Sequence, residues 1–474
     1  MKKAIAGTLL LTGLALAAIL ANQAVERDRE YRRLIVQGDD ALSRGHTFEA
    51  IEAFSGAIAL RNGSMLAYLK RGQAHQRGGD TPESLTAALR DFRTAIEKDP
   101  AAMRALEELG DVNYKLHRYS NAADSYESYL RLDDRSAVVL YKLALASRGD
   151  GRLSRAVSAL QQAVKLNPSF AEAYYVLGLC LKERDQLKEA QAAFEQAVRV
   201  SPAMIAPREE LADLHRAQGQ TRKEIEQLEA LAALDSQKAD RLIAVGLAYL
   251  NGGNRDLAVT ALGRAAEQFP KQPGVYAALG QVWLQAAEDR GDPTDVRKAL
   301  EALEPVASQA SASSEQLGLY GRALTLAGQS ERAEQAFRQA SQRFPTDPDV
   351  LLPLAALAQE LGHLEEARQA LVRYSVLVDD DRDEAAHAAR IADLSLQLND
   401  AATAATWYEK SDALVPADAT QLSRLAEAQL KAGRTQDAQG TVTRALAKDP
   451  ANATARALAR RLPSMLTPAD PQTR

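Results

Sequence analysis

The sequence predicts an all-α protein built from a repeated pair of helices, and two observations support this fold class. Hydrophobic residues make up 46% of the 474 residues, whereas aromatic residues make up only 5%. Such a composition suits closely packed helices with small side chains between them better than a sheet-built core. The second observation is a pattern of two amphipathic segments that returns about every 34 residues along most of the chain.

The pattern is complete within residues 171–202. Its first segment carries Tyr174, Leu177, Gly178 and Leu181, and its second carries Ala190, Phe194, Ala197 and Pro202. Spacings of three and four place the second-segment residues on one stripe of a helix. Gly178 and Ala190 are small enough for two antiparallel helices to approach closely. The arrangement of Leu-Gly followed by Ala-x3-Phe-x2-Ala-x4-Pro resembles the tetratricopeptide repeat (TPR), a helix pair of 34 residues.

Twelve such units follow one another between residues 31 and 450, which excludes chance. The resemblance implies a TPR solenoid: a right-handed superhelix whose first helices line the concave side. Extra residues occur near 78–82, where we expect a longer loop, and near 288–293. The small polar stretch 308–314 is a candidate hinge. We therefore divide the chain into an N-terminal transmembrane anchor or signal segment, repeats one to eight, repeats nine to twelve, and a capping helix with a tail: residues 1–24, 25–307, 308–450 and 451–474.

The N-terminus predicts a membrane segment. Lys2 and Lys3 precede an uncharged and mostly apolar run at 4–21, and eighteen helical residues span about 27 Å, enough to cross a bilayer. Residues 15–17 offer a small-x-small cleavage site, so a cleaved signal peptide is the alternative to an uncleaved anchor. Neither proline nor glycine occurs in 25–33, which predicts that this helix continues into the first repeat.

Two lysines before an apolar run are typical of exported proteins. These lysines favour an N-terminus that stays in the cytoplasm. Four basic residues follow the run and argue for the opposite orientation of the segment in the membrane: Arg27, Arg29, Arg32 and Arg33. We expect a single-pass inner-membrane protein with its array in the periplasm. Secretion to the periplasm after signal cleavage and a cytoplasm-facing array are the alternatives.

Composition and motifs argue against an enzyme. The net charge of −5 lacks the basic excess of a dedicated nucleic-acid binder. A single cysteine, Cys180, excludes an intramolecular disulfide and zinc sites that need two thiolates, and we expect it to be a buried structural thiol. The six histidines form no metal-binding motif, and Gly252 and Gly253 fall at a turn between helices, not in a phosphate loop. We therefore assign no catalytic, cofactor or metal residues.

The TPR resemblance implies which side chains face the concave side. They lie at three positions of each first helix: the third residue before its Gly or Ala site, and the first and fourth residues after that site. In repeats four to seven these are Tyr141, Leu145, Arg148; Tyr175, Leu179, Lys182; Glu209, Asp213, Arg216; and Ile243, Leu247, Leu250. All of these positions except Glu209, Asp213 and Leu250 form our candidate partner-binding site.

Two features of this set suggest a partner. Arg148, Lys182 and Arg216 occupy one equivalent position in successive repeats and should stack as a basic ladder. Beside them Tyr141, Leu145, Tyr175 and Leu179 should form an apolar strip, so a segment with apolar anchors and acidic residues would match both. The alternative is a solvated basic face with tyrosines that pack neighbouring repeats. If the groove binds, Tyr175→Ala with Lys182→Glu should weaken partner capture without unfolding the array.

The carboxylate clamp of some TPR proteins uses an Asn directly after the Gly or Ala site. In the first six repeats that position holds Asp39, Gln73, Asp111, Leu145, Leu179 and Asp213. We therefore expect no such clamp.

These observations favour a non-enzymatic protein–protein interaction scaffold, tethered to the membrane and assembling a cell-envelope complex. In architecture the array resembles TPR modules of bacterial secretion, pilus, outer-membrane and exopolysaccharide export machinery. The alternatives are a cytoplasm-facing adaptor of an inner-membrane complex and an exported carrier that binds polysaccharide or peptidoglycan. The identity of the partner, the pathway and the oligomeric state are left open by the sequence.

Overall fold

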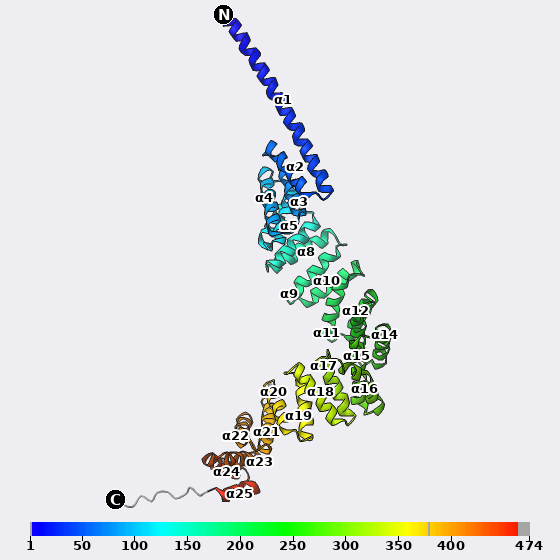
Figure 1. Cartoon of the computed structure of the whole chain (residues 1–474), viewed down its shortest axis with the longest axis vertical. Coiled ribbons are helices and arrows are strands. Elements are labelled where there is room, and N and C mark those ends of the chain that lie inside the picture. The colour runs from blue at the N-terminus through cyan, green and yellow to red at the C-terminus, as the bar shows by residue number, and fades with distance from the viewer. Residues whose placement is uncertain (1, 378–379, 463–474) are drawn as a thin grey trace, which may run out of the picture. The chain divides into compact units, whose positions relative to one another are not determined.

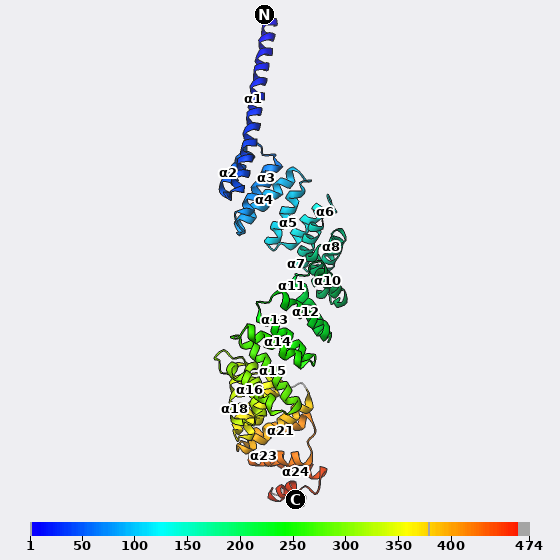
Figure 2. The same cartoon turned by 90° about the vertical axis from the view of Figure 1, so that its right-hand side faces the viewer.

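The computed structural model describes residues 2–377 and 380–462, without the side chains of residues 2–15, 17 and 18. All regular structure in these ranges is α-helical (Figures 1 and 2). The helices fall into two compact units, Met1–Leu234 and Asp235–Arg474.

The first unit contains helices α1 to α12, which Figures 1 and 2 label between them. Their bounds are α1 (Lys2–Ser43), α2 (Thr47–Leu60), α3 (Met65–Arg77), α4 (Pro82–Lys98), α5 (Met103–Lys115), α6 (Tyr119–Leu130), α7 (Ala137–Gly149), α8 (Leu153–Leu166), α9 (Ala171–Glu183), α10 (Leu187–Val200), α11 (Ile205–Ala217) and α12 (Thr221–Leu234).

The second unit contains α13 to α25. Their bounds are α13 (Ala239–Asn251), α14 (Arg255–Gln268), α15 (Pro273–Arg290), α16 (Pro293–Ala307), α17 (Ser314–Leu326), α18 (Ser330–Arg343), α19 (Pro348–Glu360), α20 (Leu364–Ser375), α21 (Asp381–Gln397), α22 (Ala401–Leu414), α23 (Ala419–Lys431), α24 (Thr435–Lys448) and α25 (Ala453–Arg461).

Within each unit every odd-numbered helix packs against the even-numbered helix that follows it, and that helix packs against the next odd one. Several odd-numbered helices also contact each other directly, among them α7 with α9 and α15 with α17. The first helices of successive repeats therefore adjoin along one side. This arrangement of helix pairs, with α25 packed on α23 and α24 at the end, confirms the predicted all-α, TPR-type solenoid.

The packing of each repeat depends on a small residue opposite a large one. Gly178 of α9 faces Phe194 of α10, whose ring is fully buried, and a Cβ added at position 178 would lie under 3.0 Å from that ring. The same relationship joins Gly72 to Phe92 and Gly246 to Leu262. Any larger residue would force the helices of the pair apart.

The two insertions have different outcomes. The extra residues near 78–82 form the expected loop between α3 and α4. Those near 288–293 instead lengthen α15 to 18 residues, because no glycine or proline lies between Gly280 and Gly291, which ends the helix with a φ of 66°. In the segment 308–314, Ala312 is buried and Ser313 caps α17 through a capping box with Gln316. A hinge there stays a prediction.

Helix α1 runs without a break from Lys2 to Ser43, and it contributes Tyr31 and Ile35 to the core of the first repeat. The prediction that the N-terminal helix continues into the array is therefore confirmed. Among the described residues, no helix is both long enough and apolar enough to cross a bilayer. The predicted membrane segment, 4–21, lies largely outside the residues whose side chains are described, and the expected tail from 467 onward lies outside them entirely.

Candidate protein-interaction face

The predicted apolar strip lies on two neighbouring first helices of the first unit. Tyr141 and Leu145 on α7 and Tyr175 and Leu179 on α9 are each partly buried, and each packs against the core of that unit. All four remain partly exposed to solvent. Part of each of these four side chains thus belongs to the packing of the repeats, and a continuous partner-binding strip stays a prediction.

The two tyrosines rest on phenylalanine rings. The ring centroid of Tyr141 lies 5.0 Å from that of Phe170, and that of Tyr175 lies 6.0 Å from that of Phe194. These distances are typical of aromatic pairs. Burial raises the pKa of both tyrosine hydroxyls, so both are neutral at physiological pH. The phenylalanine rings therefore hold both tyrosine rings in place. The part of each tyrosine that remains exposed offers an apolar ring surface and a hydroxyl group that can donate a hydrogen bond.

The predicted basic ladder is neutralised by acidic residues. Arg148 donates from Nε and Nη2 to Oε1 of Glu183 at 2.8 and 2.5 Å, and Lys182 donates to Oε2 of Glu210 at 2.7 Å. Arg216 has two acidic partners, Glu224 at 2.7 Å and Asp213 at 3.1 Å. The equivalent positions do carry three basic residues, but each has an ion-pair partner. This face therefore does not present these three basic residues as a row of unpaired positive charges.

The remaining predicted residues lie in the second unit, on α13. Ile243 and Leu247 are partly buried and pack on the cluster formed by α13, α14 and α15, whereas Leu250 is 4% exposed. Leu250 is therefore a core residue, and Ile243 and Leu247 present the apolar surface of this repeat.

Sequence reasoning missed a set of ion pairs that tie successive first helices together. In each, a basic residue two positions before the Gly or Ala site binds an aspartate one position after that site in the preceding repeat. The pairs are Lys70–Asp39 at 2.7 Å, Lys142–Asp111 at 2.7 Å and Arg424–Asp393 at 2.9 Å. Each pair spans 31 residues, and this recurring spacing is the signal that could have revealed them.

Two of these aspartates also bind a tyrosine of their own repeat. Tyr126 on α6 and Tyr408 on α22 occupy the position that holds Phe194 in the repeat at 171–202, and their hydroxyls donate to Asp111 and Asp393. The carboxylate of Asp111 thus joins three helices. Burial of Lys142 lowers its pKa, but hydrogen bonds to Asp111 and Glu107 outweigh that effect, so the pKa is raised and the ammonium is retained.

The single thiol, Cys180 on α9, is fully buried, as predicted. Burial raises its pKa to about 11, which suppresses the reactive thiolate. It can serve packing but not nucleophilic chemistry in the folded repeat.

Comparisons with known proteins agree with this architecture. Three family models described as "Tetratricopeptide repeat" match residues 147–202 and 324–391, residues 35–91 and 83–137, and residues 244–271. Together these matches span more than half of the chain, so the chain belongs to the tetratricopeptide repeat family. Proteins of this family are scaffolds for protein interactions and are generally non-catalytic.

Similar solved structures include MamA, YrrB and PilF. MamA from Desulfovibrio magneticus RS-1 is 22% identical, with 37% of this chain and 97% of that chain covered and a TM-score of 0.35. YrrB, described as a TPR protein with an unusual peptide-binding site, is 23% identical, with 48% and 98% covered and a TM-score of 0.29. PilF from Pseudomonas aeruginosa is 22% identical, with 44% and 94% covered and a TM-score of 0.34. No curated protein matches the sequence.

Proposed function

We propose that this protein is a non-enzymatic scaffold that holds a protein partner on the first helices of its first unit and is tethered to the membrane by its N-terminal helix. The observation that carries the proposal is the partly exposed strip of Tyr141, Leu145, Tyr175 and Leu179. Aromatic and aliphatic side chains that are already held by their neighbours lose little conformational entropy on binding, which favours affinity.

The ion pairs beside the strip limit the chemistry of the partner. Because Arg148 and Lys182 already bind Glu183 and Glu210, acidic residues of a partner would have to displace these carboxylates. The partner is therefore a peptide or helix with apolar anchors, and charge contributes orientation more than affinity. Lys182→Glu would also break the Lys182–Glu210 pair between repeats, so aromatic substitutions provide a cleaner test.

The test places a photo-crosslinking amino acid at Leu145 or Leu179 in cells, with position 174 as the control. Tyr174 lies on the same helix as Leu179 and outside the strip. We expect the same crosslinked protein from positions 145 and 179, loss of that product with Tyr141→Ala and Tyr175→Ala together, and its retention with Tyr174→Ala. Equal crosslinking from all three positions would remove the proposal.

For localisation we propose the inner membrane, with the array in the periplasm as part of a secretion, pilus, outer-membrane or exopolysaccharide export complex. The apolar run at 4–21 supports this, as do Leu16, Ile19 and Leu20 of α1, which are 59%, 55% and 57% exposed. Apolar side chains left uncovered on a long helix favour insertion into lipid.

A C-terminal alkaline phosphatase fusion, with intact-mass analysis of the membrane fraction, tests the topology. Active phosphatase on an uncleaved chain is the expected result. Inactive phosphatase with a fluorescent cytoplasmic reporter would instead make the chain a cytoplasm-facing adaptor. Active phosphatase on a chain that has lost its first 17 or so residues would make it an exported carrier.

A further inference from the structure

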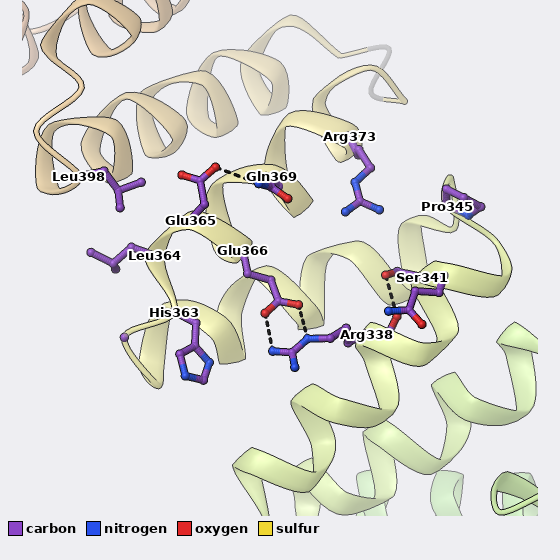
Figure 3. A pocket seen from close by; sticks show the side chains of 12 residues that line it. Arg338, Ser341, Pro345, His363, Leu364, Glu365, Glu366, Gln369, Arg373 and Leu398 are labelled. Atoms are coloured by element: carbon purple, nitrogen blue, oxygen red, sulfur yellow. Dashed lines mark hydrogen bonds and ion pairs between the residues drawn. The ribbon is translucent and has the colours of Figure 1, made fainter.

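Three metal-ligating side chains meet between the second helices of the ninth and tenth repeats, within the second unit. Glu334 lies on α18, His363 is the residue before α20, and Glu366 lies in the first turn of α20. Their ligand atoms all lie within 4.8 Å of one another, and Nδ1 of His363 is 2.7 Å from Oε1 of Glu334. Figure 3 shows the Glu366 carboxylate directed toward Arg338 of α18, with His363 beside them.

The carboxylates of this cluster require a positive charge. The side chain of Glu334 is only 5% exposed, and a buried carboxylate is costly unless a cation neutralises it. Arg338 supplies that charge: it donates to both oxygens of Glu366 and lies 3.3 Å from Oε1 of Glu334. The guanidinium therefore occupies the position of a cation between the two glutamates.

Arg338 is partly exposed to solvent, and a cavity opens beside it. The side chain of Arg338 is 41% exposed, whereas that of Glu334 is fixed in the interface. A cavity of about 960 Å³ opens beside the cluster, and Arg338, His363 and Glu366 line it. Its volume accommodates both a hydrated metal ion and the displaced arginine side chain.

We propose that Glu334, His363 and Glu366 bind one divalent transition-metal ion of the zinc class, and that Arg338 is the cation that replaces the metal when none is bound. One imidazole nitrogen and two carboxylate oxygens are ligands that Zn²⁺ accepts, and three protein ligands leave a fourth position for water. Two carboxylates balance the charge of the ion once the guanidinium has withdrawn.

The geometry requires little rearrangement. Ligand atoms in a tetrahedral zinc site lie roughly 3.3 Å apart, so atoms within 4.8 Å of one another need only small side-chain rotations. His363 immediately precedes α20 and Glu366 lies in its first turn, while Glu334 comes from the facing helix. The ion would therefore link the ninth repeat to the tenth, at a location that the candidate interaction face does not include.

The test is calorimetric titration of the chelator-treated full-length protein, purified in detergent, with ZnCl₂ at pH 7.5. We expect one ion per chain, and we expect His363→Ala and Glu366→Gln each to weaken binding about 100-fold or more. His46→Ala is the matched control, because His46 and Glu49 form a His–Glu pair of the same spacing at the start of α2. It should leave the affinity unchanged. Binding that His363→Ala does not weaken, or no stoichiometric binding at all, would overturn the proposal.

Arg338→Gln separates a metal site from a purely structural ion-pair cluster. If Arg338 competes with the metal, this variant binds Zn²⁺ more tightly than the natural chain, and Zn²⁺ raises its Tm by more. If the cluster is structural only, the variant is less stable and Zn²⁺ does not restore its Tm, which would overturn the proposal. Circular dichroism of each variant before titration distinguishes loss of ligands from loss of fold.

Discussion

The hydroxyl of Tyr126 donates a 2.7 Å hydrogen bond to Oδ1 of Asp111, from the second helix of a repeat to its first. Lys142, on the first helix of the next repeat, binds Oδ2 of the same carboxylate at 2.7 Å. One aspartate therefore holds together α5, α6 and α7. The same arrangement recurs in the second unit, where Asp393 binds Tyr408 and Arg424.

Tyr126→Phe keeps the ring that fills the core and removes only the hydroxyl. A hydrogen bond to a charged group contributes roughly 1.5 kcal/mol or more, so we expect the free energy of unfolding to fall by about that amount. Because repeat arrays unfold in parts, hydrogen exchange of the α5 and α6 amides is the appropriate measurement, alongside urea unfolding. Tyr174→Phe is the control and should change little. Unchanged exchange in Tyr126→Phe would show that the Asp111 bond is energetically neutral.

Arg71 and Asp91 form a partly buried ion pair between α3 and α4. Nε and Nη2 of Arg71 donate to the two carboxylate oxygens at 2.8 and 2.7 Å, and the side chain of Asp91 is only 7% exposed. Arg71→Ala removes both of these hydrogen bonds and leaves only His75 Nε2, 3.8 Å away, beside the buried carboxylate. We therefore expect a loss of about 3–5 kcal/mol in the free energy of unfolding, measured by urea unfolding.

An exposed pair provides the matched control for this substitution. Arg29 and Glu26 on α1 are both more than half exposed, and Arg29→Ala should cost less than about 1 kcal/mol. In addition, Arg71→Met combined with Asp91→Leu should recover most of the loss. Equal effects of Arg71→Ala and Arg29→Ala would contradict the prediction.

His215 on α11 should make the first unit sensitive to acid. Its side chain is buried, with the residue 2% exposed, and this burial lowers its pKa below the ordinary value. As the pH falls through about 6.5, the unfolded chain takes up a proton that the folded chain does not. Stability is therefore lost toward low pH. The urea midpoint should drop between pH 7.5 and 5.5, and His215→Leu should reduce that drop; an identical drop in both proteins would assign the acid sensitivity elsewhere.

Cys180 should react slowly with thiol reagents. Its pKa of about 11 leaves a very small thiolate fraction at pH 8, and its side chain is fully buried. We expect the native protein to react with a disulfide reagent at least about 100-fold more slowly than the urea-unfolded chain. Rapid labelling of the native protein would show that the fifth repeat opens readily.

The helices could be predicted because their signals are local. The helical spacing of Ala190 and Phe194 and the small residue Gly178 are sufficient to predict the helix pair, since Gly178 faces Phe194 within one repeat. The sequence places the three basic residues of the ladder at equivalent positions, but it does not reveal their acidic partners. Glu183 and Glu210 belong to neighbouring repeats, and only the register between repeats places them against Arg148 and Lys182.

The cluster at Glu334, His363 and Glu366 shows the same limit. A motif search along one helix finds no metal site, because Glu334 lies 29 residues before His363 and on another helix.

By itself, the sequence determined that this is an all-α TPR array with an apolar N-terminal run, because periodicity and small-residue spacing act over a few turns of helix. The tertiary structure decided which charges are neutralised, which basic residues bind across repeats and which ligating groups meet. Those outcomes depend on contacts about 30 residues apart, such as Lys142 with Asp111, where packing and register between repeats bring together groups that no local pattern connects.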